Sequence, residues 1–361
     1  MRNFLARAII VCLLCTTLSG CSPSDSGESS TGQTDEITVV FVPKLTGNAF
    51  FEAANEGAQE YAGKYGFRVE YSGASEAVVS KQIAIIKDAI ERKVDALCVS
   101  SLDATALDDV MKDAMAAGIK VATWDSDVSG DARTVMVSQG TPAQLGQMLV
   151  EMGARSLDER GKNATNDAIK YAWHYSQASV TDQNSWRVAG EKYIQETYPN
   201  WVNVATGNYY SEQNAEKAIT VGESIFTNHP DIDLIICNDS TALPGQAQAA
   251  QNLGLYAEDV TITGFASPNA MRDYCKAGVL KRWGLWDCQV QGAIGCYLAY
   301  YLAAGNELRV GDRVNVPAIG IVEVMPNTVL DPNAYTAEDS GVVLLPKRTE
   351  FTIENVDAYN F

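Results

Sequence analysis

The chain has 361 residues, of which 46% are hydrophobic and 20% are charged, so it is long enough for two globular domains. Its formal net charge is -18. Nucleic acids and anionic membrane surfaces bind cationic proteins, so this charge argues against both as partners. It does not argue against a small neutral or polar ligand.

The N-terminus has the pattern of a secretory signal. Arg2 and Arg7 precede a short apolar stretch, residues 8–18, which is too short to span a bilayer as a stable helix. The stretch ends in "LSGC", residues 18–21, which resembles a bacterial lipobox, in which cleavage precedes a cysteine that receives lipid. We therefore predict a signal peptide at residues 1–20 and lipidation of Cys21. An ordinary signal peptide with an incidental cysteine is the alternative.

Residues 22–35, "SPSDSGESSTGQTD", contain almost no apolar side chains. This composition is typical of a disordered linker, and we predict a flexible tether over residues 21–36. The tether would hold the folded part close to the membrane surface.

From residue 37, short apolar runs alternate with amphipathic segments. Strands are predicted at residues 37–41, 67–71, 96–100, 119–124 and 135–138, and helices lie between them. This alternation is typical of a parallel sheet covered by helices on both faces. The second half repeats the pattern, with strands predicted at 169–174, 203–207, 234–237, 260–264 and 280–285.

We therefore predict an α/β protein of two doubly wound parallel-sheet lobes joined by a multi-strand hinge. The helix predicted at residues 289–304 would return to the first lobe. The N-terminal lobe is expected to comprise residues 37–142 and 287–316. The C-terminal lobe is expected to comprise residues 143–286 and 317–361, although the pattern of the tail from Asn315 is weak.

Polar side chains follow the strands of both predicted sheets. Ligands of open parallel sheets bind beyond the carboxyl ends of the strands, so these side chains would meet in one cleft if the lobes face each other. Carboxylates accept hydroxyl hydrogen bonds, an ammonium donates them, and an indole can stack on a sugar ring. This chemistry suits a small polyol. The predicted binding residues are Lys44, Asp125, Asp182, Gln183, Asn238, Ser240, Trp286 and Asp287.

Each of these residues also has a purely structural interpretation. Asp182 could cap a helix, and Asp127 and Asp239 could be turn residues. Lys44 alone could be a surface charge, and Trp124 and Trp286 alone could belong to the core. The coincidence of polar groups at five strand ends favours the binding site.

No catalytic, cofactor or metal motif is present. Glycine-rich nucleotide loops, H-E-x-x-H and G-x-S-x-G are absent, and the chain has only two histidines. We expect no enzyme activity, no cofactor and no metal, with Asp125 and Asp182 as the candidate pair if the protein were a glycosidase. Most cysteines after Cys21 should be buried and free, and a Cys288–Cys296 disulfide is left open.

The chain resembles the type I periplasmic sugar-binding proteins, and more closely the LsrB family of receptors for the quorum signal autoinducer-2. The resemblance extends over nearly all of the chain after Asp35 and includes "VPKLTGNAFFEAANEGAQE", "TWDSD", "SVTDQN", "DSTALPGQAQAAQNL", "GLWD" and "GVVLLPKR". It implies that the ligand lysine is Lys44, the strand-end aspartate is Asp125, and the Asp-Gln pair is Asp182 and Gln183.

The resemblance implies a monomeric, membrane-tethered solute-binding lipoprotein that delivers autoinducer-2 to an ABC permease outside the cytoplasm. The chain departs from the family at two positions, where Asn238 and Ser240 replace a proline and an alanine. If the backbone makes the contacts there, the change is tolerated; if not, the ligand could be another small sugar, such as a pentose or a deoxyhexose. A related DNA-binding repressor would need an N-terminal helix-turn-helix, and the signal segment stands in its place.

Overall fold

The computed structural model describes residues 36–205, 207 and 209–361. The predicted signal peptide, the lipidation site Cys21 and almost all of the predicted tether lie outside these ranges. Within them, no helix combines the length and the apolar character that crossing a membrane requires.

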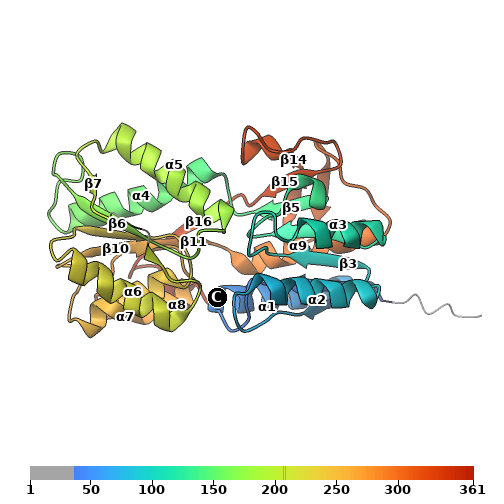
Figure 1. Cartoon of the computed structure of the whole chain (residues 1–361), viewed down its shortest axis with the longest axis horizontal. Coiled ribbons are helices and arrows are strands. Elements are labelled where there is room, and N and C mark those ends of the chain that lie inside the picture. The colour runs from blue at the N-terminus through green and yellow to red at the C-terminus, as the bar shows by residue number, and fades with distance from the viewer. Residues whose placement is uncertain (1–35, 206, 208) are drawn as a thin grey trace, which may run out of the picture. The chain divides into compact units, whose positions relative to one another are not determined.

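The described residues form two lobes, each built on its own sheet (Figure 1). The first sheet has the strand order β14-β15-β5-β4-β3-β1-β2, and the second has the order β10-β9-β6-β7, with β8 also paired to β6. The strands of the first sheet are β1 (Thr38–Val42), β2 (Arg68–Tyr71), β3 (Ala96–Val99), β4 (Lys120–Trp124), β5 (Val135–Ser138), β14 (Met325–Pro326) and β15 (Gly341–Leu344). Those of the second are β6 (Lys170–Tyr175), β7 (Val202–Asn203), β8 (Tyr209–Tyr210), β9 (Leu234–Cys237) and β10 (Thr261–Gly264).

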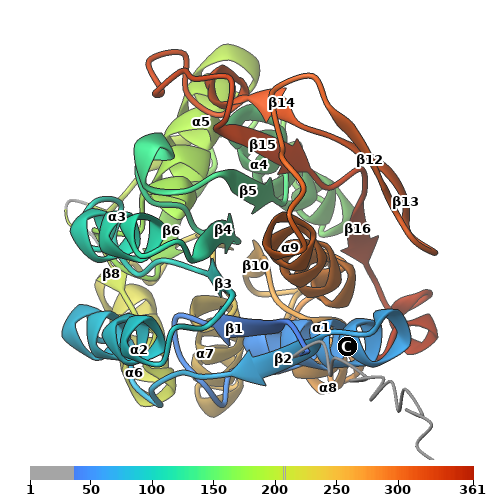
Figure 2. The same ribbon diagram turned by 90° about the vertical axis from the view of Figure 1, so that its right-hand side faces the viewer.

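Helices cover both faces of the first sheet. Figure 2 shows α2 and α3 on one face and α1 and α9 on the other. These helices are α1 (Ala49–Tyr65), α2 (Val79–Glu91), α3 (Asp108–Ala116) and α9 (Cys288–Ala303). Because both faces are buried, the strands are apolar throughout; all five residues of β1 are buried.

The second sheet is covered in the same way. In Figure 1, α4 and α5 lie above it and α6, α7 and α8 lie below it. Their bounds are α4 (Pro142–Glu159), α5 (Thr181–Thr197), α6 (Ala215–Asn228), α7 (Ala242–Asn252) and α8 (Pro268–Lys276). The predicted two-lobed α/β architecture with parallel sheets is therefore confirmed.

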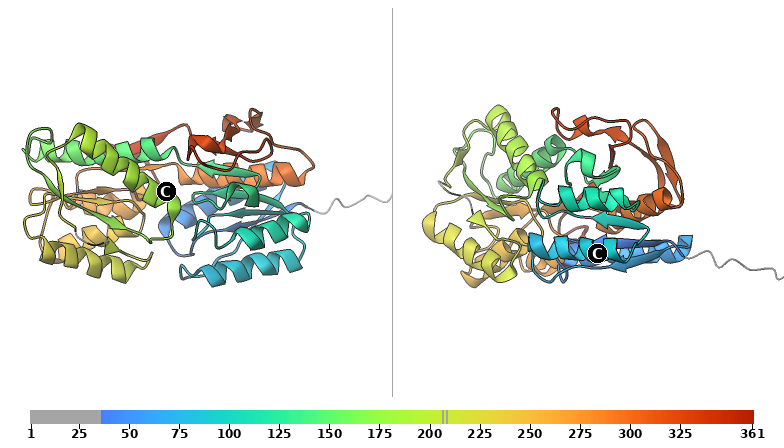
Figure 3. Two further views of the ribbon diagram at one scale, coloured as in Figure 1. Left: turned by 45° about the horizontal axis from the view of Figure 1, so that its top comes forward. Right: turned by 45° about the vertical axis from the view of Figure 1, so that its right-hand side comes forward.

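The C-terminal tail is divided between the lobes. We predicted residues 317–361 in the C-terminal lobe, but β15 pairs in parallel with β5, and β14 pairs with β15, so both strands extend the first sheet. In Figure 3 these red strands lie beside the cyan elements of the first lobe. Only β16 (Arg348–Phe351) and the residues after it join the second lobe, where β16 pairs with β11 (Trp283–Trp286).

The buried guanidinium of Arg133, paired with Asp127, attaches the segment around β14 and β15 to the first lobe. Arg133 is bonded to Asp127, and its remaining guanidinium hydrogens are donated to Asn327, Ser340 and the carbonyl of Gly341. The contacts join residues about two hundred positions apart, which a strand pattern cannot foresee. A two-stranded hairpin, β12 (Arg313–Val316) and β13 (Gly320–Glu323), precedes this region.

The five cysteines of the described part are free and buried, so Cys288 and Cys296 form no disulfide. Nowhere in the same part do three or more His, Cys, Asp or Glu side chains gather as they would around a metal ion.

Candidate functional site

A pocket of about 350 Å³ lies where the carboxyl ends of β1, β4, β9 and β11 come together. Both lobes contribute to its lining, which comprises Lys44, Phe50, Phe51, Asp125, Gln183, Trp186, Gln213, Asn238, Asp239, Ser240, Phe265, Leu285 and Trp286. Six of the eight predicted binding residues are in this set, and Asp182 and Asp287 are not.

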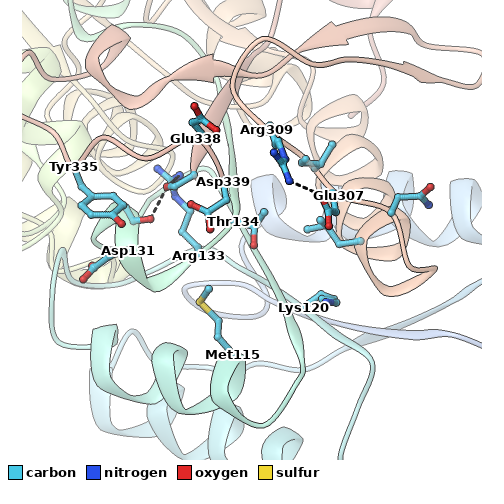
Figure 4. A pocket seen from close by; sticks show the side chains of 15 residues that line it. Met115, Lys120, Asp131, Arg133, Thr134, Glu307, Arg309, Tyr335, Glu338 and Asp339 are labelled. Carbon is cyan, nitrogen blue, oxygen red and sulfur yellow. Dashed lines mark hydrogen bonds and ion pairs between the residues drawn. The ribbon is translucent and has the colours of Figure 1, made fainter.

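A larger pocket, of about 1,080 Å³, lies at the opposite end of β4 and β5 (Figure 4). Its deeply buried cation, Arg133, is committed to the tail contacts described above. Its other charged groups, such as Lys120 and Asp131, are exposed to solvent. The smaller pocket, whose polar groups are largely buried, is therefore the candidate site.

Lys44 and Asp125 form an ion pair at the edge of the first sheet. Nζ of Lys44 lies 2.9 Å from Oδ2 of Asp125, and the hydroxyl of Ser100 donates to the same oxygen at 2.7 Å. Burial alone would lower the pKa of Lys44, but the nearby carboxylates of Asp125, Asp182 and Asp239 raise it above its usual value. The ammonium is therefore charged at neutral pH.

Asp125 occupies a tight turn that ends β4. Its φ is 60°, in the left-handed region that few residues other than glycine adopt, and the N–H of Ser126 donates to the carbonyl of Trp124 at 2.6 Å. Such strain is often found at binding sites. Trp124 itself is fully buried and stacks on Phe41 with ring centres 4.5 Å apart, so it belongs to the core.

The turn brings Ser126 to the second lobe. Its hydroxyl donates to Oδ1 of Asp182 at 2.8 Å, and Nε2 of Gln139 donates to Oδ2 of Asp182 at 3.4 Å. Asp182 lies in the first turn of α5, but Val180 holds the cap position and has no capping side chain. Burial raises the pKa of Asp182 to about 6, although Lys44 opposes that rise. Asp182 thus joins the lobes beside the pocket and does not cap its helix.

Asn238 connects the end of β9 to α5. Its Nδ2 donates to the carbonyl of Gln183 at 2.9 Å, while its Oδ1 is buried without a partner among the described residues. The amide oxygen of Gln183 in turn accepts from the hydroxyl of Ser176. A ligand hydroxyl could satisfy the free oxygen of Asn238.

Asp239 has one oxygen in use and one free. Its Oδ1 accepts from the N–H groups of Thr241 and Ala242 at 2.6 and 2.8 Å, which confirms a turn role for it. Its Oδ2 is buried and has no partner in the described chain. Burial raises the pKa of Asp239 to about 6, against the lowering effect of those two N–H groups.

Ser240 contacts the first lobe. Its hydroxyl donates to Oδ1 of Asn48 at 3.3 Å, and Nδ2 of Asn48 donates to the hydroxyl of Thr241 at the same distance. The sequence interpretation overlooked Asn48, which is also the N-cap of α1.

Trp286 forms an aromatic wall of the pocket. It packs edge to face against Phe50, Trp186 and Phe265. Its indole N–H donates to Gln291 at 2.6 Å. Gln291 donates to the side chain of Gln139 at 3.1 Å, so a chain of hydrogen bonds links Trp286 to the residue that contacts Asp182.

The structure does not bring Asp287 into the pocket. Its carboxylate is exposed and accepts from the N–H of Val290 at 3.0 Å, which caps α9. A strand-end aspartate before a helix gives the same sequence signal whether it caps the helix or binds a ligand. Conversely, Gln213 lines the pocket, although it lies in a loop that no predicted strand end marked.

A family model for the periplasmic binding protein domain matches residues 39–307. Among curated proteins, the chain is similar to the ribose import binding protein RbsB of Bacillus subtilis, with 26% identity over 264 residues that cover 72% of this chain and 80% of that one. It is also 25% identical to the D-ribose/D-allose-binding protein of Pseudomonas aeruginosa, covering 85% of this chain and 94% of that one.

Among solved structures, LsrB from Clostridium saccharobutylicum in complex with AI-2 matches with a TM-score of 0.89 and 62% identity. The match covers 90% of this chain and 100% of that chain. A solute-binding protein of an ABC transporter from Clostridium phytofermentas, with bound L-rhamnose, has a TM-score of 0.79 at 22% identity, covering 90% and 98% of the two chains. That second likeness shows the fold alone.

Proposed function

Because the chain belongs to the periplasmic binding protein family, we propose that it is a substrate-binding lipoprotein that captures autoinducer-2 between its lobes for import by an ABC transporter. The observation that carries the proposal is the likeness to an LsrB with bound AI-2 at 62% identity. It is supported by a pocket lined by three of the four residues that the resemblance implies, Lys44, Asp125 and Gln183. The ribose-binding relatives support import of a small sugar in general.

The chemistry of the pocket supports a small polyol. Lys44 supplies a buried cation. Asn238 and Asp239 line the pocket, and each has a buried side-chain oxygen with no hydrogen-bond partner among the described residues. Buried acceptors without a partner destabilise the empty protein, and ligand hydroxyls would satisfy them. Contacts between the lobes, such as Ser126 with Asp182, would form as the lobes close on the ligand.

The decisive experiment is to purify the protein, unfold it, and identify chemically the ligand that it releases. Titration calorimetry of the refolded protein with autoinducer-2 then gives the affinity, which we expect to be micromolar, about -8 kcal/mol. Release of a different sugar and no heat with autoinducer-2 would overturn the ligand assignment.

A receptor for another small sugar, such as a pentose or a deoxyhexose, is the second candidate. The observation that favours it is Asn238, which lines the pocket at a position where the resembled family has proline. Competition of autoinducer-2 with D-ribose and L-rhamnose on one sample separates the two candidates.

The family acts outside the cytoplasm. We further propose that Cys21 anchors the protein by a lipid at the outer face of the cytoplasmic membrane, and that the protein is a monomer that engages a permease. Cys21→Ser should release the protein from the membrane fraction while the soluble form still binds ligand. Retention of that variant in washed membranes would rule out the lipid anchor.

We propose no catalytic activity. A glycosidase would need one carboxyl as acid and a second as nucleophile or base. Here Asp125 is held in an ion pair with Lys44, and Asp182 accepts hydrogen bonds from Ser126 and Gln139. Recovery of unchanged ligand after long incubation with the protein is the expected result.

A further inference from the structure

A strained loop between β8 and α6 contributes one more residue, Gln213, to the lining of the pocket. Glu212 and Gln213 are consecutive residues with φ of 52° and 54°, and neither is glycine. The loop is fixed to the end of β6, since the N–H of Glu212 donates to the carbonyl of Ser176 at 2.7 Å. The N–H of Gln213 donates to the hydroxyl of Ser211 at 3.3 Å. Two consecutive strained residues persist only where surrounding contacts hold the backbone, as these two hydrogen bonds do. The fixed backbone in turn restricts the directions that the two side chains can take.

The side chain of Gln213 is buried beside the pocket. Gln213 is one of the lining residues and is only 8% exposed. Its Nε2 is buried, and no hydrogen-bond acceptor contacts it within the described residues. A buried donor without a partner is costly, so the site favours an occupant that supplies an acceptor.

The amide N–H of Gln213 differs from the other buried polar groups of the pocket, which are acceptors or are already paired. The free atoms of Asn238 and Asp239 are oxygens, which accept hydrogen bonds from a ligand. The ammonium of Lys44 already contacts Asp125. The amide of Gln213 therefore provides from the second lobe a donor that complements two acceptors.

We propose that Gln213 is a specificity-determining residue that donates a hydrogen bond from Nε2 to an oxygen of the bound polyol. The inference rests on the proposed function, because it concerns the same pocket. It defines the ligand class more closely: a neutral polyol with an oxygen that faces the loop of Glu212 and Gln213. An analogue that lacks this oxygen leaves the donor buried and unpaired, and should bind more weakly.

The test compares Gln213→Leu with the wild type by titration calorimetry. Leucine has a similar size and the same backbone requirement, but it lacks the amide. We expect affinity for autoinducer-2 to fall about tenfold, which corresponds to about 1.4 kcal/mol. We also expect the empty variant to melt at the same or a higher temperature, because the substitution removes a buried unpaired donor.

Glu212→Gln is the matched control. Glu212 has the same backbone strain, but its side chain pairs with Lys217 outside the pocket. Its affinity should stay within about twofold of the wild type, that is within about 0.4 kcal/mol. Wild-type affinity of Gln213→Leu, or a lower melting temperature of the empty variant, would overturn the inference, since the second result indicates a structural role.

The wild type and Gln213→Leu are also titrated with D-ribose. If the wild type binds D-ribose and not autoinducer-2, the proposed ligand is wrong. Weaker D-ribose binding by Gln213→Leu would still support the role of Gln213, and unchanged D-ribose binding would overturn it. The two failures are thus distinguishable.

Discussion

Nζ of Lys44 and Oδ2 of Asp125 lie 2.9 Å apart with side chains that are 1% and 5% exposed. Removing two charges from water is costly, and the pair is sustained by its close contact and by the hydroxyl of Ser100. The wider surroundings add the carboxylates of Asp182 and Asp239, which act on Lys44 in the same direction as Asp125. Lys44 and Asp125 therefore line the pocket and also contribute to the stability of the first lobe.

Substitution of Lys44 tests this dual role. Lys44→Met should abolish measurable binding and lower the free energy of unfolding by about 3 kcal/mol, because a buried carboxylate loses its partner. Lys44→Met with Asp125→Asn should recover most of the stability and none of the binding. Urea denaturation and calorimetry measure the two quantities. If Lys44→Met alone has the same urea midpoint of unfolding as the wild type, the pair does not stabilise the first lobe.

The stability of the empty protein should rise as the pH is lowered from 7 to 5. Burial raises the pKa values of Asp182 and Asp239 from 3.8 to about 6. Between pH 3.8 and 6 the folded protein holds more protons than the unfolded chain, so stability falls as the pH rises through this window and then levels off. Thermal denaturation across this range checks the sign.

Ligand affinity should respond in the opposite direction. Ionised carboxylates accept hydroxyl hydrogen bonds better than protonated ones, so affinity at pH 5 should be about tenfold lower than at pH 7.5. Asp239→Asn provides the control, because the amide does not titrate; its affinity should depend less on pH. Equal pH dependence in the variant and the wild type would show that Asp239 is not the responsible group.

Much of the pocket follows from the sequence for a simple reason. Parallel strands end at one edge of a sheet, so residues directly after apolar runs, such as Lys44, Asp125 and Asn238, had to lie together. Asp287 satisfied the same rule and still caps a helix, because capping and ligand binding use the same residue type at the same place.

Other features depend on long-range contacts. The position of β15 follows from its pairing with β5, and Arg133 joins it to Asn327 and Ser340 across most of the chain. No local pattern contains that information. Gln213 lies at the pocket on a loop with positive φ, a conformation that a sequence without glycine does not suggest.

Substitutions of Asn238 test whether the ligand is recognised by its side chain or by its backbone. Its backbone N–H donates to the carbonyl of His174 at 3.3 Å, so this donor is used by the sheet. Asn238→Ala keeps that bond, loses the contact with Gln183 and removes the free oxygen; we expect affinity to fall about tenfold and stability by about 1 kcal/mol. Asn238→Pro removes the N–H as well and should be less stable still.

Calorimetry and thermal denaturation separate these effects. Wild-type affinity of Asn238→Ala would show that the backbone carbonyl alone recognises the ligand, as a proline at this position in the resembled family would require. Ser240→Ala serves as a comparison, since its hydroxyl contacts Asn48 and not the free oxygen of Asn238.

Asn48 combines a helix cap with a contact between the lobes. Its Oδ1 accepts from the N–H of Phe50 at 2.9 Å, and its amide also contacts Ser240 and Thr241 of the second lobe. Serine caps helices about as well as asparagine but is too short to reach the other lobe. Asn48→Ser should therefore keep the stability of the empty protein and weaken ligand binding several-fold, because the closed form loses two contacts.

Asn48→Ala provides the matched comparison. It loses the cap and the contacts together, so its stability should fall by about 1 kcal/mol in addition to the same loss of affinity. Denaturation of the empty proteins and calorimetry with ligand give both values. If Asn48→Ser binds as tightly as the wild type while Asn48→Ala does not, the contacts between Asn48 and the second lobe contribute nothing to closure, and the residue acts only as a cap.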